Sequence, residues 1–239
     1  MIRAEEMIGR TFMIAVTGGS GSGKTTLSRA LHDRLGEGGS SLVTEDNYYL
    51  PRAAHNPPVV GWSNEQIERT INFDDPASKD MALFRSHLQD LRQGKPVLQP
   101  VYDFSIHDRV ADAVHRIDPR AVVIVEGLHV LSDPGNAKFF DLTVFVDTGD
   151  DLRLIRRIRR DRAERGRASE GVIQQYLRFV RAAHQRFTQP AKYVCDLVIA
   201  DEGGPAFAHE APDFAAVDRL VAPVWARLVA MGVIGAHRV

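Results

Sequence analysis

The chain contains one full match to the pattern G-x-x-x-x-G-K-[ST], in the stretch Gly18-Gly19-Ser20-Gly21-Ser22-Gly23-Lys24-Thr25, which Thr26 continues. An apolar run at 12–16 precedes it and an amphipathic run at 24–35 follows. Glycines in such a loop let backbone N–H groups turn inward around an oxyanion, and the next helix adds the positive end of its dipole. Lys24 can then reach the β- and γ-phosphates while the Thr25 hydroxyl ligates Mg²⁺. The stretch therefore predicts a strand, a phosphate-binding loop and a helix that bind a nucleoside triphosphate.

The length and composition are those of one globular domain. The chain has 239 residues, of which 44% are hydrophobic and 26% charged, so we expect a single domain over 1–239. Its net charge of −1 gives no general attraction to nucleic acid or to a membrane surface. No apolar stretch approaches the roughly 20 residues that a membrane span needs. The single cysteine, Cys195, suits a reducing compartment, and we expect a cytoplasmic protein.

Apolar runs and amphipathic runs alternate along the chain. The run at 122–125 is apolar at every position, as in a strand covered on both faces. Such alternation predicts an α/β fold, with a mostly parallel five-stranded sheet and helices on both faces. We expect strands near 11–17, 41–44, 121–125, 142–146 and 194–200, and helices at 24–35, 78–93, 151–165, 169–188 and 213–231.

Two segments break this alternation. The region 97–117 mixes polar and apolar residues after Pro96 and around Pro100, which favours a β-hairpin outside the main sheet. The segment 50–71 contains Pro51, Pro57 and Pro58, and we interpret it as an irregular insert. A long structureless stretch inside a compact domain is more often functional or mobile than idle.

Carboxylates follow two of the expected strands, at the edge of the sheet where ligands bind. Asp46 follows the strand at 41–44, where it can accept a proton from an attacking hydroxyl group. Its alternative role is that of a turn or N-cap carboxylate. Glu126 closes the strand at 122–125, and with Thr25 it predicts a Mg²⁺ site. A surface glutamate after a strand is the alternative there.

Arginines are concentrated at 153–167, with eight in that stretch against Asp161 and Glu164. A solvated basic helix face and a nucleic-acid patch are two interpretations. The third is a lid at about 157–167, because phosphoryl transfer needs cations on the migrating group and a site that excludes water. We favour the lid, and we expect no nucleic-acid partner.

Together these residues resemble the uridine kinase branch of the phosphoribulokinase/uridine kinase family of P-loop kinases, from about Ile14 to Gly204. The resemblance is carried by these motifs: Gly18 to Thr26; Asp46 with Tyr48-Tyr49; Asn72-Phe73-Asp74-x-Pro76; Pro100-x-Tyr102-Asp103-Phe104-x-x-His107-x-Arg109; Glu126-Gly127; Arg160-Asp161; Glu164-Arg165-Gly166-Arg167; and Gln175-Tyr176. The Tyr-Asp-Phe-x-x-His-x-Arg and Glu-Arg-Gly-Arg runs are the most specific of them.

The resemblance implies an ATP-dependent transfer to the 5′-hydroxyl of uridine or cytidine in pyrimidine salvage, with Mg²⁺, by a homo-oligomeric enzyme, a dimer or tetramer. It implies that Asp46 is the catalytic base and that Asp74 holds the ribose 2′- and 3′-hydroxyls. It further implies a base pocket and two lid arginines that meet the phosphates. The pocket residues are Tyr102, Phe104, His107, Arg167 and Gln175, and the lid residues are Arg160 and Arg165.

Three departures from the family pattern lie on the acceptor side. Asp75 stands where uridine kinases generally carry histidine, Thr44-Glu45 replaces the usual Ser-Gln, and the insert 50–71 is longer than expected. A kinase of another small alcohol, as phosphoribulokinase and pantothenate kinase are, therefore remains the alternative. A GTP-binding switch protein is disfavoured because the chain has no N-K-x-D motif. Whether ATP or GTP is the donor stays open.

Overall fold

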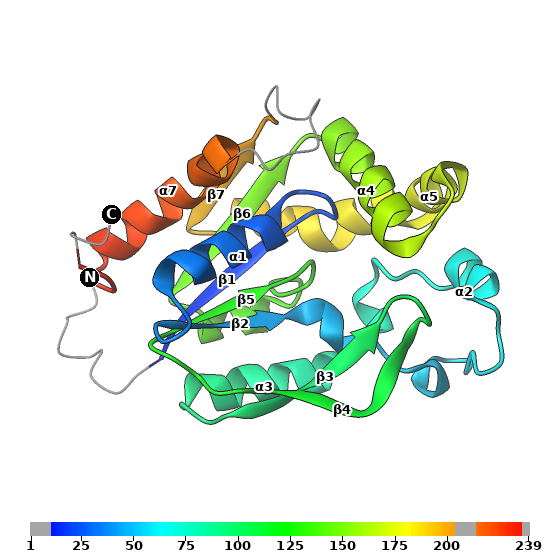
Figure 1. Cartoon of the computed structure of the whole chain (residues 1–239), viewed down its shortest axis with the longest axis horizontal. Helices are drawn as coiled ribbons and strands as arrows, with labels where there is room; N and C mark the ends of the chain where they lie inside the picture. Colours follow the sequence, from blue (N-terminus) through cyan, green and yellow to red (C-terminus); the bar gives the residue numbers. More distant parts are fainter. Residues whose placement is uncertain (1–10, 204–213, 236–239) are drawn as a thin grey trace.

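The computed structural model describes residues 11–203 and 214–235. Its centre is a five-stranded sheet in the order β2-β5-β1-β6-β7, in which every neighbouring pair is parallel (Figure 1). The strands are β1 (Phe12–Gly18), β2 (Ser40–Thr44), β5 (Val122–Glu126), β6 (Leu142–Thr148) and β7 (Leu197–Asp201). The predicted α/β fold with a parallel five-stranded sheet is confirmed.

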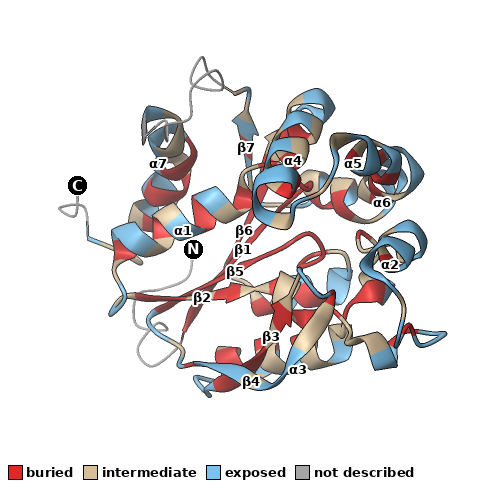
Figure 2. Cartoon of the chain, turned by 45° about the vertical axis from the view of Figure 1, so that its right-hand side comes forward, coloured by how far each residue is buried: buried red, intermediate tan, exposed pale blue. Residues whose placement is uncertain are grey.

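The sheet separates two hydrophobic cores, which explains why its strands are apolar at consecutive positions. Along β1, Ile14 belongs to one core and its neighbours Met13 and Ala15 to the other. Helices α1 (Lys24–Leu35) and α7 (Phe214–Ala230) contribute to the first core, and α3 (Met81–Arg92) contributes to the second. The central strands are accordingly buried, as Figure 2 shows.

The stretch predicted as one helix at 169–188 is helical throughout but not uniform. It consists of α5 (Ser169–Gln175), η6 (Tyr176–Val180), α6 (Arg181–Ala183) and η7 (His184–Thr188), of which η6 and η7 are π-helical. A hydrophobic period of 3.6 residues does not reveal such local widening of the turn. The 3₁₀ segment η8 (Gln189–Tyr193) then leads to β7. No helix in the described part of the chain is long and apolar enough to cross a bilayer.

The predicted hairpin outside the main sheet is confirmed. Strands β3 (Val97–Asp103) and β4 (Asp108–Ile117) pair antiparallel, with a register shift between Pro100 and Tyr102. The hairpin is tied to the 3₁₀ turn η2 (Glu45–Tyr48) by Arg109, whose guanidinium donates to the carbonyl groups of Tyr49 (2.9 Å) and Tyr48 (3.2 Å). Residues at the hairpin turn are thereby held beside the C-terminal end of β2.

The insert 50–71 is more regular than we predicted. It contains η3 (Arg52–Ala54) and helix α2 (Asn64–Thr70). A capping box starts this helix, because the Ser63 hydroxyl accepts from the backbone N–H of Gln66 (3.2 Å) and the Gln66 side chain accepts from that of Ser63 (2.8 Å). The pattern Ser63-x-x-Gln66 is the local signal that would have predicted it.

Two further 3₁₀ turns lie in the connections between these elements. The turn η4 (Pro76–Ser78) occupies the start of the helix predicted at 78–93, so α3 begins only after the N-cap Asp80. The turn η5 (Pro134–Phe139) lies between β5 and β6. Helix α4 (Asp150–Arg165) follows β6 and, with α5, lies opposite α2 and the hairpin (Figure 1). The acceptor-side residues lie between these two groups of elements.

Candidate active site

The phosphate-binding loop joins β1 to α1 as predicted. Gly21 and Gly23 have φ angles of 81° and 93°, which favour glycine. A Cβ atom on Gly21 would lie 2.4 Å from the backbone carbonyl oxygen of Arg153, so the loop packs too closely on α4 for a side chain there. The Thr148 hydroxyl donates to the carbonyl of Ser22 at 2.9 Å and anchors the loop to β6. The loop is thus a backbone cradle of the kind that phosphates occupy.

The two predicted Mg²⁺ ligands meet beside this loop. The Thr25 hydroxyl donates to Oε2 of Glu126 at 3.1 Å. Burial raises the pKa of Glu126 to about 7, so a cation beside this carboxylate would favour its ionised form. No group of three or more His, Cys, Asp or Glu side chains in the described residues could hold a metal ion. The pair fits Mg²⁺, which usually takes one or two protein ligands and completes its shell with phosphate oxygens and water.

One pocket brings together most of the residues that the sequence singled out. It opens between the phosphate-binding loop, η2, the hairpin turn and the end of α4. Of the predicted site residues, its wall includes Ser20, Lys24, Asp46, Asp74, Phe104, His107, Arg160, Arg165, Arg167 and Gln175. Segments far apart in the chain therefore converge on a single pocket next to the phosphate-binding loop.

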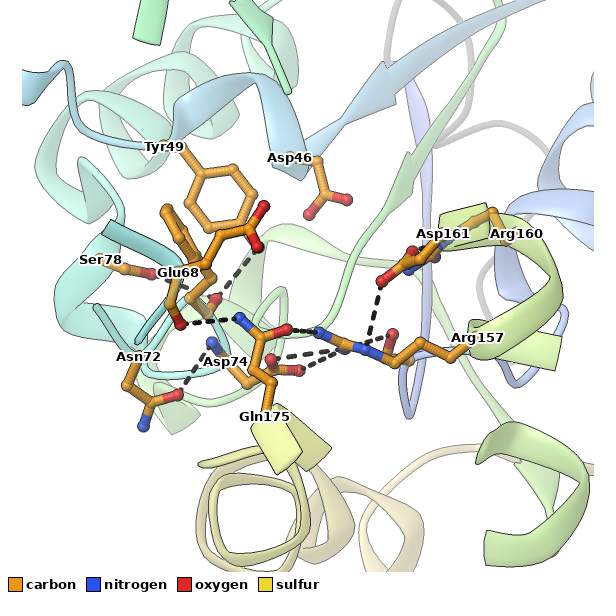
Figure 3. A network of polar contacts seen from close by, with 12 residues as sticks. Asp46, Tyr49, Glu68, Asn72, Asp74, Ser78, Arg157, Arg160, Asp161 and Gln175 are labelled. Atoms are coloured by element: carbon orange, nitrogen blue, oxygen red, sulfur yellow. Dashed lines mark hydrogen bonds and ion pairs between the residues drawn. The ribbon is translucent and has the colours of Figure 1, made fainter. Parts of the chain in front are cut away.

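Asp46 lies at the phosphate end of this pocket, where its carboxylate points into the open space (Figure 3). Its Oδ1 accepts from Nζ of Lys79 at 2.9 Å. Burial opposes ionisation of Asp46, but Lys79 and Lys24 together hold its pKa well below the ordinary range. The group is therefore a carboxylate at neutral pH, able to accept a hydrogen bond from a hydroxyl group.

Asp74 faces the pocket from the segment before η4. Its carboxylate is nearly buried and lies 3.4 and 3.5 Å from Nη1 of Arg157, as drawn in Figure 3. Its neighbour Asp75 does not line the pocket, because its Oδ1 caps η4 by accepting from the N–H of Ala77 at 2.8 Å. The departure from the family pattern at position 75 is therefore a structural cap rather than a pocket residue.

The arginines predicted as a lid gather around one buried carboxylate. Asp161 accepts from Arg160 at 2.9 Å and from Arg167 at 3.3 Å, and it lies 3.6 Å from Arg165. Against the effect of burial, Arg160, Arg157 and Arg165 lower the pKa of Asp161. The guanidinium of Arg165 also lies over the Phe104 ring at 4.2 Å. Asp161 thus aligns several cations along one wall of the pocket, and their movement as a lid remains a prediction.

The far wall is formed by a connected set of polar groups. His107 lies with Nε2 3.0 Å from Glu68 of α2, and Arg167 lies 3.0 Å from the other oxygen of that carboxylate. Oε1 of Gln175 accepts from Arg157 and from Arg167, each at 2.9 Å. The His107 ring also stacks on Phe73, with centroids 5.2 Å apart. The insert therefore contributes Glu68 to the acceptor side.

Tyr102 is the one predicted acceptor residue outside the wall of this pocket. Its ring packs behind, 5.1 Å from Tyr49 and 5.2 Å from Phe104. Its hydroxyl is buried without a hydrogen-bond partner. Buried polar atoms are rarely left unpaired, so this hydroxyl is a candidate contact for a ligand that enters the pocket more deeply.

Several functional candidates were not predicted from the sequence. Arg157 was one of eight arginines, yet it alone joins Ser20 (2.9 Å), Asp74 and Gln175. Like Arg157, the residues Glu45, Glu68 and Lys79 pair with groups from distant segments, which no local pattern reveals. The other candidates are Glu45, Glu68, Lys79 and the anchoring Asp161.

Comparison with known proteins places the chain in one family. A family model described as "Phosphoribulokinase / Uridine kinase family" matches residues 13–204. A protein named uridine kinase from Deinococcus deserti is 44% identical over 194 residues, which cover 81% of this chain and 89% of that protein. Another named uridine kinase, from Oceanobacillus iheyensis, is 42% identical over 191 residues, covering 80% and 87%.

Among solved structures, the phosphoribulokinase from Rhodobacter spheroides has a TM-score of 0.57 at 19% identity, and the match covers 80% of this chain and 70% of that one. At this level of identity the likeness concerns the fold, which is that of the P-loop kinases. With the phosphate-binding loop, the pocket beside it and the family match over 13–204, the chain belongs to the phosphoribulokinase/uridine kinase family.

Proposed function

We propose that this protein is a nucleoside kinase that transfers the γ-phosphoryl group of ATP to the 5′-hydroxyl of uridine or cytidine, giving UMP or CMP. Its similarity to proteins named uridine kinase, at about 40% identity over most of their length, supports this proposal. The single observation that carries it is that Lys24, Asp46, Asp74 and His107 line one pocket. These four residues can bind, in that order, a phosphate, the acceptor hydroxyl, the ribose diol and the base.

The donor side consists of the phosphate-binding loop and the Thr25–Glu126 pair. The loop N–H groups and Lys24 bind the phosphates, and Thr25 with Glu126 would hold Mg²⁺, which neutralises charge on the phosphates when bound. ATP as the donor follows from the family; GTP is the alternative. Arg160 and Arg165 face the same pocket and stabilise charge on the migrating group.

The transfer itself needs an oriented hydroxyl more than a strong base. Asp46 accepts the hydroxyl hydrogen bond and takes the proton as the oxygen–phosphorus bond forms and the bond from the γ-phosphorus to ADP breaks. Phosphoryl transfer passes through a loose transition state, so the proton leaves late and a carboxylate of low pKa suffices. The position of Asp46 between Lys24 and the acceptor pocket suits this role.

The acceptor side suits a ribonucleoside. A vicinal diol can bond to both oxygens of Asp74, and aromatic rings from Phe73, Phe104 and Tyr49 supply walls for a flat base. The unpartnered hydroxyl of Tyr102 and the ring of His107 offer polar contacts to the edge of that base. Arg167 and Gln175 complete the pocket at the lid side.

The alternative acceptor is another small alcohol. The observation that favours it is Glu68, which places a carboxylate against His107 and brings the insert 50–71 into the acceptor side. A polyol or phosphorylated sugar would leave the aromatic walls and the Tyr102 hydroxyl without a ligand partner. We therefore rank it second.

The test is a panel of acceptors scored by ADP release, with the product of each positive reaction identified by mass spectrometry. The panel contains uridine, cytidine, adenosine, 2′-deoxyuridine, pantothenate and ribulose 5-phosphate, each with ATP and with GTP. We expect uridine and cytidine with ATP to give by far the largest kcat/KM. Phosphorylation of another alcohol but of neither pyrimidine nucleoside would contradict the proposed acceptor and support the kinase activity.

The pathway, compartment and assembly of the enzyme are part of the same proposal. As a kinase of free nucleosides it would act in pyrimidine salvage, in the cytoplasm, as a homo-oligomer. Light scattering coupled to size-exclusion chromatography measures the subunit number, for which we expect a dimer or a tetramer.

A further inference from the structure

A lysine is buried behind the acceptor pocket, where the proposed reaction does not by itself require one. The Lys79 side chain has no solvent exposure and follows η4 directly. Its backbone forms a short antiparallel bridge with Tyr49, flanked by hydrogen bonds from Leu50 to Ser78 (3.0 Å) and from Asp80 to Tyr48 (2.8 Å). The segment that carries Asp46 is therefore paired with the segment that carries Lys79.

Lys79 joins two carboxylates that are neighbours in the chain. Its Nζ lies 2.9 Å from Oδ1 of Asp46 and 3.1 Å from Oε1 of Glu45, and it lies over the Tyr49 ring at 4.4 Å. The Glu45 side chain is fully buried, while that of Asp46 is 33% exposed toward the pocket. Glu45 thus neutralises the buried Lys79 cation on the side away from the pocket, and Asp46 presents its own carboxylate to the pocket.

Glu45 is itself fixed against the strand that carries the candidate metal ligand. Its Oε2 accepts from the backbone N–H of His129 at 2.8 Å. A Cβ atom on Gly127 would lie only 2.0 Å from that same oxygen, so the carboxylate occupies the space that glycine leaves. The chain of contacts therefore runs from the end of β5 through Glu45 and Lys79 to Asp46.

We propose that Lys79 and Glu45 form a buried charge pair that positions Asp46 for phosphoryl transfer, Lys79 holding Oδ1 so that Oδ2 meets the acceptor hydroxyl. This rests on the proposed role of Asp46 as proton acceptor. In the transfer, the proton of the acceptor hydroxyl passes to Asp46, the oxygen–phosphorus bond forms, and ADP leaves with the electrons of the broken bond. Lys79 remains protonated throughout, which makes it a positioning residue.

The charges around Asp46 determine what happens when Lys79 is removed. Without the lysine, Glu45 and Asp46 are adjacent carboxylates in a largely buried site, and like charges favour protonation of one of them. Removal of both Lys79 and Glu45 leaves Asp46 with neither the lysine cation nor the neighbouring carboxylate. The other ionisable groups that face Asp46 are Lys24 of α1, Arg165 of α4, Glu126 of β5, His129 after β5, Asp74 before η4, and Tyr49 and Tyr102.

The experiment compares Lys79→Met, Lys79→Arg, Glu45→Gln, the double variant Lys79→Met/Glu45→Gln, and Asp46→Asn. The control is Lys192→Met, which removes a lysine from its ion pair with Asp147. The Lys192 side chain is 31% exposed, whereas that of Lys79 is fully buried. For each protein, kcat and KM are measured with uridine and ATP from pH 5.5 to pH 9. The free energy of unfolding is measured over the same range.

We expect Lys79→Met to lower kcat at pH 7 by about tenfold to a hundredfold and to move the acid limb of the kcat profile up by at least one pH unit, with KM for ATP nearly unchanged. Lys79→Arg should keep the wild-type profile shape. The double variant should recover part of this loss and return the acid limb toward wild type, because Asp46 then has no adjacent carboxylate to raise its pKa.

A kcat profile of Lys79→Met parallel to that of the wild type would overturn the positioning role and leave only a structural one. If Lys79→Met does not fold, the double variant and Lys79→Arg carry the same comparison. Failure of the proposed function is a separate result: Asp46→Asn would then retain kcat, or the wild type would not phosphorylate uridine. In that case the free energy of unfolding alone tests the charge pair. The decrease in this free energy caused by Lys79→Met should become larger as pH rises, and it should be smaller in the double variant.

Discussion

Nε2 of His107 lies 3.0 Å from Oε1 of Glu68, so the insert 50–71 holds a residue of the hairpin turn in place. The second oxygen of that carboxylate lies 3.0 Å from Arg167 of the lid segment. Burial opposes ionisation of Glu68, but the bond to His107 and the charge of Arg167 lower its pKa overall. An ionised Glu68 fixes the orientation of the imidazole ring and leaves Nδ1 for a ligand.

Replacement of Glu68 by glutamine should weaken acceptor binding and spare the donor side. The amide keeps the shape but loses the charge that His107 and Arg167 share, so we expect KM for uridine to rise about tenfold with little change in KM for ATP. The matched control is Glu65→Gln on the same helix, where Glu65 and its partner Arg69 are both exposed. An unchanged KM for uridine in Glu68→Gln would show that His107 is positioned without this carboxylate.

Lys24→Ala should fold and lose phosphoryl transfer. The side chain lies in the pocket wall at the start of α1, and in the proposed function it supplies the cation that meets the β- and γ-phosphates. We expect kcat with uridine to fall by at least about a hundredfold, the scale of losing one charged contact to the transition state. The exposed Lys95 provides the control, since Lys95→Ala should leave kcat unchanged. Near-normal turnover in Lys24→Ala would remove the basis for a nucleotide site at this loop.

The parts of the site that can be predicted are those that a local sequence motif specifies. The phosphate-binding loop depends on glycines at fixed spacing. Glu126 is the last residue of β5, and Asp46 comes two residues after β2, so both lie where the strands end at one sheet edge. Lys79 carries no such signal, because its burial follows from the pairing of its segment with that of Tyr49.

The same physical reason limited the prediction of the lid and the insert. Arginine content indicates a cationic helix end, but only tertiary packing makes Arg157 the arginine that bonds Ser20, beside Asp74. Glu68 lies on a short helix whose capping box is a local sequence pattern. Its contact with His107 joins positions 39 residues apart, so no local pattern predicts it. Pairings of this kind are determined by the whole fold rather than by spacing.

Arg165→Ala should slow turnover more than it weakens acceptor binding. Its guanidinium lies over Phe104 and beside Asp161, facing the pocket where the phosphoryl group would pass. We expect kcat to fall by about tenfold or more and the share of ATP lost to water to rise, because the proposed lid would close the site less completely. ADP release without UMP formation measures that share. Arg162→Ala, on the exposed side of the same helix, is the control. Unaltered ATP hydrolysis in Arg165→Ala would contradict a lid function.

Mild acidification should remove the contribution of one buried histidine to stability, against the opposite effect of Glu126, whose raised pKa makes its protonation favour the folded state. Burial lowers the pKa of His129 from its ordinary value near 6.5 to about 3. The unfolded chain binds the proton below pH 6.5 while the folded protein does not, so this contribution is complete above pH 6.5 and is lost as pH falls toward 3. Between pH 6.5 and pH 5 the loss is about 2 kcal/mol.

Denaturant unfolding of wild type and His129→Gln at several pH values measures this contribution. The variant should lack the loss between pH 6.5 and pH 5, although its stability at pH 7 is lower. His115→Gln, on the exposed strand β4, should follow the wild type throughout. Equal slopes in wild type and His129→Gln would assign the acid sensitivity to other groups.

The two adjacent aspartates 74 and 75 offer a matched pair for the acceptor itself. Asp74 lines the pocket beside Arg157, whereas Asp75 caps η4. A carboxylate built to bind a diol discriminates steeply against an analogue that lacks one hydroxyl, because a buried acceptor is then left unpaired. We expect the wild type to prefer uridine over 2′-deoxyuridine by about a hundredfold or more in kcat/KM. Asp74→Asn should lower kcat/KM for uridine on that scale while affecting the deoxynucleoside less, so that the preference shrinks. Asp75→Asn should retain the preference and lose at most about 1 kcal/mol of stability through its weaker cap. If the preference survives in Asp74→Asn, another group holds the ribose.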